Sequence, residues 1–449
     1  MSLIVQLFEK CLSPNNQIRQ TGEQELFNYS AQNFYKALSD CCSIIVNNES
    51  PMNIRQFSGT FIKYIFSNDI YTSQWNKLSL EQIEFIKNNL MGSLASEKQE
   101  IRQASSLAIA ALAKIELPKG WNVIEVLSNT SHHENNNYRI TSLITFKNIV
   151  DFMKSNLKQE DINTILCSFM DNMDLKLNQS VIYQATYEFQ YIIPYIENNF
   201  KNEKQREYII DSLNNLLNMN YIQQVALNET IQKCILIDFI EILRHYTKYI
   251  QKSFNKIAET TFRYFHCNNE GLAALSVEIW STLCDGELEL KTNFITSNYQ
   301  DTLAQSLIRI FQEREKNLLD GEDTLNLTKA SMILISCLAQ VGNKNLVDRM
   351  LSYISECLNN EIMKKADINF QNMTKEEKIN ALFIKQNAFL IYRGVLSYEK
   401  INSEIIMSSL QKIILELKNI NSLPIGESIA YCLLYICKYH FNQRRKKNF

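Results

Sequence analysis

The sequence predicts an all-α protein built as an α-solenoid, a stack of helix pairs that grows in length without thickening. Only ten glycines and five prolines occur in 449 residues, so residues that break helices are scarce. A single hydrophobic core stops growing at roughly 250 to 300 residues, and no Gly/Ser-rich or Pro-rich linker divides this chain. Similar amphipathic segments also recur at intervals of about 40 to 57 residues. A long, helix-rich and repetitive chain is typical of a solenoid.

The clearest helix is expected over residues 272–290. The face next to its apolar stripe carries small side chains, Ala273, Ala274 and Ser276, which allow another helix to pack closely. Its apolar stripe has three- and four-residue spacing and comprises Leu272, Leu275, Ile279 and Leu283. This segment is therefore predicted to be the second helix of a two-helix repeat.

The same second-helix pattern recurs along the chain, with small residues at its centre, as in 104–113 and 140–146. Each occurrence follows a first helix, for example 80–95 or 158–173. The nine occurrences begin near Ile54, Ile101, Ile140, Ile182, Ile231, Leu272, Lys329, Lys385 and Ile425.

This spacing is in the range of HEAT repeats with two insertions, expected as loops at 313–327 and 364–378. One repeat cannot bury its apolar face alone, so about ten stacked repeats are predicted to form a curved superhelix.

Composition excludes several functional classes. No apolar run approaches 18 residues and no cationic start precedes an apolar stretch, which excludes a membrane span and a secretory signal and predicts a soluble intracellular protein. The net charge of −2 includes no basic face apart from 444–447, a solvated end or a nuclear-localisation-like cluster, so nucleic acid is not expected as a direct partner.

The eleven cysteines are odd in number and include no Cys-x-x-Cys, which argues against zinc and redox chemistry. Eight lie within apolar helical patterns and are predicted to fill the core: Cys11, Cys167, Cys234, Cys284, Cys337, Cys357, Cys432 and Cys437.

Catalysis is not expected. Only His132-His133 and His266-Cys267 suggest metal or nucleophile chemistry, and neither pair has partners at ligand spacing. No phosphate-binding, dinucleotide-binding, nucleophile-elbow or HExxH motif occurs. We therefore predict no catalytic residues, no metal and no cofactor, and a function in recognition by helical surfaces.

Several of these segments also resemble the importin-β (karyopherin-β) family. Within 272–290, the residues Glu278, Ile279, Trp280, Cys284, Asp285 and Glu287 are similar to the corresponding family helix. Residues 54–64, preceded by 20–26 and followed by Trp75, look like the importin-β N-terminal domain, and 109–121 resembles the exit of the third repeat. The similarity continues through 329–359, 387–397 and 410–439, and corresponds to about the first half of an importin-β.

This resemblance implies three groups of repeats. Residues 1–115 would hold repeats 1–3, and residues 116–342 would hold repeats 4–8 with a shortened acidic loop at 313–327. Residues 343–449 would hold repeats 9–10 and the basic tail.

The resemblance implies a site for the GTPase Ran on the inner helices. Its matching residues are Phe61, Lys63, Tyr64, Arg102, Ser106, Asp285, Glu287, Glu289, Asp320, Glu322 and Asp323. The alternative for single residues is that Phe61 is core and the acids form a solvated helix end. The loop at 313–327 has three acids where the family has a long acidic run followed by Trp, so weaker steering of Ran is expected.

The resemblance also implies an outer site for Phe-Gly repeats of nucleoporins, between the first helices of repeats five and six. Its wall residues would be Thr164, Leu166, Cys167, Tyr208 and Ile209. The alternative is that these side chains form an ordinary contact between helices.

Together these features predict an importin-β-like nuclear transport receptor, or its N-terminal half, that binds Ran-GTP, Phe-Gly nucleoporins and a cargo or adaptor protein. It would act in cytoplasm, nucleus and nuclear envelope. The alternative is a Ran-independent HEAT-repeat scaffold or interaction subunit. The Met1 start and basic end favour a natural short chain over a fragment. The last helix pair, 410–439, has more apolar surface than one stripe needs, so a dedicated partner or self-association is expected through 405–441.

Overall fold

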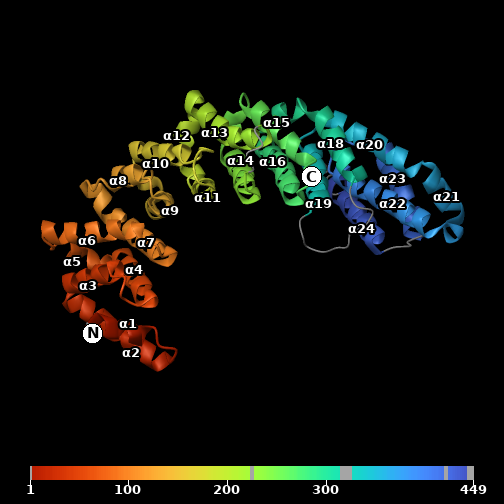
Figure 1. Ribbon diagram of the computed structural model, residues 1–449. Helices are drawn as coiled ribbons and strands as arrows, with labels where there is room; N and C mark the ends of the chain where they lie inside the picture. The colour runs from red at the N-terminus through yellow and green to blue at the C-terminus, as the bar shows by residue number, and fades with distance from the viewer. Residues whose placement is uncertain (1–2, 223–226, 314–325, 419–422, 442–449) are drawn as a thin grey trace, which may run out of the picture. The chain divides into compact units, whose positions relative to one another are not determined.

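The computed structural model describes residues 3–222, 227–313, 326–418 and 423–441, and within these residues all regular structure is helical (Figure 1). The all-α prediction is therefore confirmed. Contacts divide the chain into an N-terminal body, residues 1–234, and a C-terminal body, residues 235–449. None of the helices in the described ranges has the length and apolar character required to cross a bilayer.

The helices of the N-terminal body are α1 (Leu3–Cys11), α2 (Asn16–Gln32), α3 (Phe34–Val46), α4 (Met52–Ser67), α5 (Thr72–Trp75), α6 (Leu80–Gly92), α7 (Gln99–Glu116), α8 (Val123–Thr130), α9 (Asn136–Met153), α10 (Gln159–Asp171), α11 (Gln179–Phe189), α12 (Glu197–Lys201) and α13 (Glu203–Ile222). Consecutive second helices α4, α7, α9 and α11 pack side by side in this body. First helices pair in the same way, α3 with α6 and α8 with α10.

The remaining helices are α14 (Glu229–Ile250), α15 (Phe254–Phe265), α16 (Glu270–Glu289), α17 (Phe294–Ser297), α18 (Gln300–Glu313), α19 (Leu327–Gln340), α20 (Lys344–Leu358), α21 (Glu361–Asn369), α22 (Lys375–Val395), α23 (Ser403–Lys418) and α24 (Leu423–Ile436). Here α16, α19, α22 and α24 form the row of second helices, and α15, α18 and α20 a row of first helices. All nine predicted second-helix patterns lie in helices, so the predicted repeat pattern is confirmed.

Asparagine caps the N-terminus of many of these helices. In a chain with few prolines and glycines, these caps mark where one helix ends and the next begins. The side-chain oxygens of six asparagines accept backbone N–H groups of the first helical turn: Asn15, Asn135, Asn178, Asn269, Asn326 and Asn360. Ser79 and Thr374 form capping boxes with Gln82 and Glu377. Each cap satisfies N–H groups that have no partner within the helix.

Close packing between second helices depends on one glycine in particular. A Cβ atom on Gly59 of α4 would lie 2.7 Å from Ala104 Cβ and 3.2 Å from the Ala104 carbonyl carbon on α7. Both helices have small residues at this crossing, as the sequence predicted for the second-helix face. The absence of a side chain therefore sets the distance between α4 and α7.

Two tryptophans anchor the cores through their indole nitrogens. Fully buried Trp75 donates to Glu116 Oε1 at 2.8 Å, and fully buried Trp280 donates to Thr261 Oγ1 at 3.0 Å. Burial opposes ionisation of Glu116, but hydrogen bonds from Lys119, Trp75 and Lys87 outweigh it and lower the pKa of Glu116. The family-like residue Trp280 is therefore a packing residue.

Two local predictions were wrong. The expected loop at 364–378 is largely helical, because Asn360 caps α21 and a small cluster of Met363, Met373 and Ala381 buries its apolar side. Cys167 and Cys437 are exposed although they follow apolar patterns, because each lies on the solvent side of its helix. Most of the other predicted loop, residues 314–325, lies outside the described residues.

Candidate functional site

Three of the predicted Ran-contact residues in the N-terminal body are structural. Phe61 is only 5% exposed, and its ring lies 5.8 Å from that of Phe8. Arg102 is buried and donates to the carbonyl oxygens of Ser96 and Glu97 at 2.7 and 3.0 Å, and this burial lowers its pKa. These side chains are engaged within the protein, so their assignment as partner contacts is corrected.

Ser106 is the third corrected residue. It is fully buried on α7, and its hydroxyl accepts a hydrogen bond from Asn148 Nδ2 of α9 at 2.8 Å. The bond joins two neighbouring second helices. Its small size, which the sequence showed, serves helix packing.

Lys63 and Tyr64 reach the surface of α4. Lys63 is half-buried, and Tyr64 is 40% exposed with its ring 5.2 Å from the ring of Phe27 on α2. Phe27 is itself 37% exposed. The two rings therefore offer a small aromatic surface beside one lysine.

Two of the predicted acids of α16, Asp285 and Glu289, line a cavity of about 430 Å³ in the C-terminal body. Helices α14, α16 and α19 form its walls. We call it the acidic groove, and its lining residues are Arg244, Glu278, Ser281, Thr282, Asp285, Gly286, Glu289, Ala330 and Ile333. Its one arginine, Arg244, is already paired with Glu241. The carboxylates of Glu278, Asp285 and Glu289 therefore give the groove a net negative charge.

Asp285 and Glu289 face the groove together because residues four apart lie on one side of a helix. Burial, with a further contribution from the negative charge of Glu289, raises the pKa of Asp285. A cation placed between the two carboxylates would relieve this repulsion. The groove thus has the electrostatic character of a site for basic groups.

Glu287 points away from the groove, which corrects its predicted role. It is 1% exposed, and its carboxylate accepts Ile295 N–H at 2.6 Å and the Thr296 hydroxyl at 2.6 Å. These groups lie in the first turn of α17, so Glu287 holds α17 onto α16. Asp320, Glu322 and Asp323 lie outside the described residues.

The predicted nucleoporin residues divide between core and surface. Leu166 on α10 is 6% exposed and Ile209 on α13 is fully buried, so neither forms an exposed wall, and both assignments are corrected. Thr164 is half-buried and donates to the Glu160 carbonyl oxygen at 3.1 Å. Cys167 and Tyr208 remain available, with Tyr208 53% exposed.

Cys167 and Tyr208 lie near each other. Partial burial raises the pKa of Tyr208, and the charges of Asp171 and then Cys167 raise it further. Asp171 Oδ2 lies 3.2 Å from Nε2 of His132. Of the five predicted wall residues, Tyr208 is therefore the exposed aromatic side chain.

Some residues of these surfaces were not predicted from the sequence. Arg244 and Ile333 contribute to the acidic groove from α14 and α19, and no spacing within one helix could have associated them with α16. Tyr183 and Tyr187 of α11 and Tyr191 of the following turn form an aromatic row, with neighbouring ring centroids 5.6 and 6.2 Å apart. Their four-residue spacing was a usable signal.

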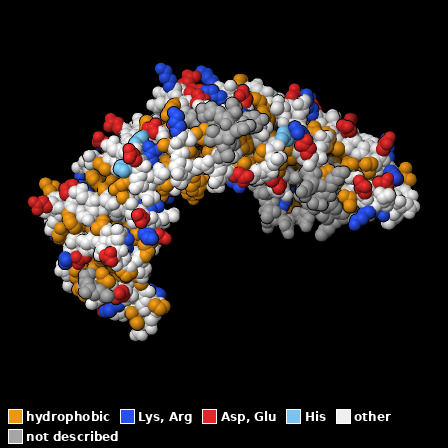
Figure 2. All heavy atoms as spheres, in the orientation of Figure 1, with side chains coloured by type: hydrophobic (Ala, Val, Ile, Leu, Met, Phe, Trp, Pro, Cys, Tyr) orange, Lys and Arg blue, Asp and Glu red, His pale blue; other side chains and the backbone are white. Residues whose placement is uncertain are grey.

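Within the described ranges, His, Cys, Asp and Glu nowhere form a group of three that could hold a metal. The two ring nitrogens of His132 have partners within the protein. Nε2 lies near Asp171 Oδ2, and Nδ1 lies 2.8 Å from the Ser128 carbonyl oxygen. On the face drawn in Figure 2, acidic and basic side chains are interspersed with apolar ones.

The fold is that of a HEAT-repeat α-solenoid. Residues 22–96 match the importin-beta N-terminal domain. The chain is 22% identical to importin subunit beta-1 of Arabidopsis thaliana, over 79% of this chain and 42% of that protein. It is 20% identical to importin subunit beta-1 of Saccharomyces cerevisiae, over 94% of this chain and 49% of that protein.

Solved structures give the same result for the fold. The structure of yeast importin-beta (Kap95p) superposes with a TM-score of 0.81 at 18% identity, covering 98% of this chain and 52% of that one. Kap95p bound to RanGDP superposes with a TM-score of 0.78 at 18% identity, covering 98% of this chain and 50% of that one. The structure of the Kap95:Nup1 complex gives a TM-score of 0.81 at 18% identity, covering 98% of this chain and 52% of that one.

The chain is therefore similar to importin-β proteins over most of its length, and its matched N-terminal domain lies at residues 22–96. It spans about half the length of the curated relatives it matches. Its similarity corresponds to their N-terminal half, as the sequence predicted.

Proposed function

We propose that the chain is an importin-β-like nuclear transport receptor, or the N-terminal half of one, that moves between cytoplasm and nucleus. In this proposal it binds Ran-GTP through the acidic groove and the Lys63–Tyr64 surface, and Phe-Gly nucleoporins through Tyr208. A cargo or adaptor protein completes its partners. The observation that carries the proposal is the acidic groove, formed by second helices at the position where the family resemblance places a Ran contact.

Relatives support the choice of partners. Kap95p, which shares this fold, is known in complexes with RanGDP and with Nup1. The three acids that line the groove, Glu278, Asp285 and Glu289, suit a basic protein surface, since complementary charge steers association and fixes register.

Reversing charge in the acidic groove should weaken Ran-GTP binding. We expect Asp285→Lys with Glu289→Lys to lower the affinity at least about tenfold, because two attractive contacts become repulsive. Binding by the unaltered chain should also fall steeply with salt, since exposed charges are screened beyond about 8 Å at physiological ionic strength. Titration with Ran-GTP at two salt concentrations measures both effects.

A matched control reverses two exposed acids on a first helix, Asp348→Lys with Glu356→Lys on α20, and should leave Ran binding unchanged. Equal losses in both variants would show that net charge, and not the groove, is responsible. If the unaltered chain does not bind Ran-GTP even at low salt, the transport proposal fails and a Ran-independent scaffold is the better interpretation.

Removing the exposed ring on α13 should weaken nucleoporin binding. Tyr208→Ala is expected to lower affinity for a Phe-Gly repeat peptide about fivefold or more, because stacking against Tyr208 is the main aromatic contact on that surface. The folded state should be nearly unaffected, since this side chain is half exposed. Tyr187→Ala on α11, a variant at another exposed tyrosine, serves as the control and should bind the peptide normally. Unchanged binding by Tyr208→Ala would remove this site.

A further inference from the structure

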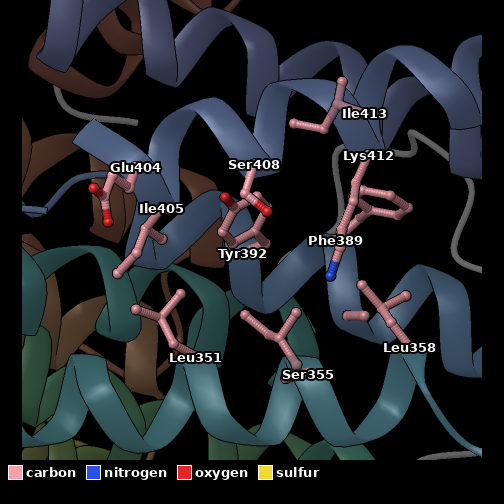
Figure 3. A pocket seen from close by; sticks show the side chains of 12 residues that line it. Leu351, Ser355, Leu358, Phe389, Tyr392, Glu404, Ile405, Ser408, Lys412 and Ile413 are labelled. Atoms are coloured by element: carbon pink, nitrogen blue, oxygen red, sulfur yellow. The ribbon is translucent and has the colours of Figure 1, made fainter. Parts of the chain in front are cut away.

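A second cavity, of about 360 Å³, lies between the first helices α20 and α23 of the C-terminal body (Figure 3). We call it the α20–α23 groove. Its floor comes from α22, through Ala388, Phe389 and Tyr392, which are all at most 7% exposed. Leu351, Ile354 and Leu358 of α20 and Ile405 and Ile413 of α23 supply its apolar walls.

The groove exists because two neighbouring first helices are separated. Helix α18 packs along α20, whereas in the described residues α23 contacts α24 and does not pack along α20 in the same way. If α20 and α23 packed directly together, their apolar side chains would contact each other. Because the two helices are apart, these side chains line an open groove instead. Cavities of this kind, apolar with a few polar groups at the edge, are typical of binding sites.

Opposite charges mark the two ends of the groove. Figure 3 shows Glu404 at the end near Leu351, and Lys412 extending toward Leu358 at the other end. In the described part of the chain, neither side chain makes an ion pair with another residue. Eight residues separate them on α23, which is about 12 Å along a helix axis.

We propose that the α20–α23 groove binds one amphipathic helical segment of a partner protein, a function beyond Ran and nucleoporin binding. The segment inserts two apolar side chains, one helical turn apart, over Phe389 and Tyr392. A basic residue of the segment pairs with Glu404, and an acidic residue about seven or eight positions away pairs with Lys412. Helix-in-groove recognition of this kind uses apolar anchors spaced by three or four residues.

The charges also set the direction of the bound segment. An acidic residue is most favourable near the N-terminus of a helix and a basic residue near its C-terminus. Since the acid must meet Lys412 and the base must meet Glu404, the segment runs antiparallel to α23. A neutral apolar ligand would fill the slot but leave both charged ends without partners, so the groove favours a charged amphipathic helix.

A designed peptide tests this proposal with the full chain. The probe is a fluorescent 14-residue helix-forming peptide with glutamate in its first turn, two leucines one turn apart, and lysine near its C-terminus. We expect binding that falls about fivefold with Lys412→Glu. The double variant Glu404→Lys with Lys412→Glu should prefer a second peptide in which glutamate and lysine are exchanged. Absence of binding by the first peptide, or equal binding of both peptides to both proteins, would overturn the proposal.

Steric variants separate the groove from the rest of α20. Ser355→Phe places a ring in the slot and should reduce peptide binding at least tenfold, whereas Ser352→Phe, at an exposed position outside the lining, should not. Ran-GTP and Phe-Gly binding should remain normal in both variants, so failure here is distinguishable from failure of the proposed function. If sedimentation shows that a second copy of the chain occupies the groove and that Ser355→Phe abolishes this association, a partner helix is not the occupant.

Discussion

Replacing Ile209 with aspartate is expected to unfold the N-terminal body, although the family resemblance suggested this residue for a surface slot. The Ile209 side chain is fully buried on α13, in the same body as the buried Leu166 and Phe200. The substitution removes buried apolar contacts and forces a carboxyl group into an apolar environment, at a cost of at least about 4 kcal/mol. Thermal melting followed by circular dichroism should show loss or strong destabilisation of this body.

The adjacent residue provides the control. Tyr208→Asp changes an exposed position on the same helix, so the free energy of unfolding should change by no more than about 1 kcal/mol. Ile209→Val, which keeps the burial and shape, should cost about 0.5 to 1.5 kcal/mol. If Ile209→Asp melts like the unaltered chain while losing Phe-Gly binding, the side chain is at the surface and the structural assignment is incorrect.

The repeat architecture was accessible from sequence because it depends on patterns that many residues share. Each second helix repeats a stripe of apolar residues with small neighbours, so the loss of any one residue leaves the pattern visible. The environment of a single side chain has no such redundancy. Phe61 and Tyr64 lie three residues apart on α4, yet one is 5% and the other 40% exposed.

The same limit explains the errors at the predicted sites. Asp285, Glu287 and Glu289 look equivalent in the sequence, but the helical rotation of about 200° between residues two apart turns Glu287 into the core. At about 20% identity, a shared fold does not determine which side chains face a partner. Residues from separate helices, such as Arg244 and Ile333 in the acidic groove, meet only through packing that no single-helix pattern contains.

Asparagine content misled the prediction for 364–378. Clusters of asparagine favour loops on average, but in this chain asparagine serves repeatedly as a helix cap. Asn360 accepts the N–H of Met363 at 2.8 Å, and the helix that follows occupies much of the expected loop. Reading asparagine as the start of a helix would have given the correct element.

Glu188 is expected to make the stability of the N-terminal body depend on pH near neutrality. Its carboxyl group on α11 is 7% exposed and accepts one hydrogen bond, from Gln184 Nε2 at 2.7 Å. Burial raises its pKa to about 7; the charge of Lys147 opposes the shift, and that of Asp151 adds to it. Lys147 pairs with Asp151 at 2.8 Å and lies over the Tyr191 ring, so it does not neutralise Glu188 through a direct bond.

The direction of the effect follows from proton binding. The folded chain holds the Glu188 proton more tightly than the unfolded chain, where the pKa has its ordinary value of 4.5. Stability from this group is therefore complete below about pH 4.5 and is lost as the pH rises through about 7. A pKa difference of about 2.5, at 1.36 kcal/mol per unit, sets an upper limit of about 3 kcal/mol.

Glu188→Gln should remove this dependence, because the amide resembles the protonated acid and carries no charge at any pH. We expect the variant to lie within about 1 kcal/mol of the unaltered chain near pH 5 and to exceed its free energy of unfolding by up to about 3 kcal/mol at pH 8. Denaturant titrations of both proteins between pH 5 and 8 give the difference directly, since their other titrating groups are shared. The same exchange at exposed Glu160 of α10 removes one negative charge from the surface and should not reproduce the gain. A constant difference between Glu188→Gln and the unaltered chain across this range would mean that Glu188 is already ionised in the folded protein, and that its burial is offset by Lys147.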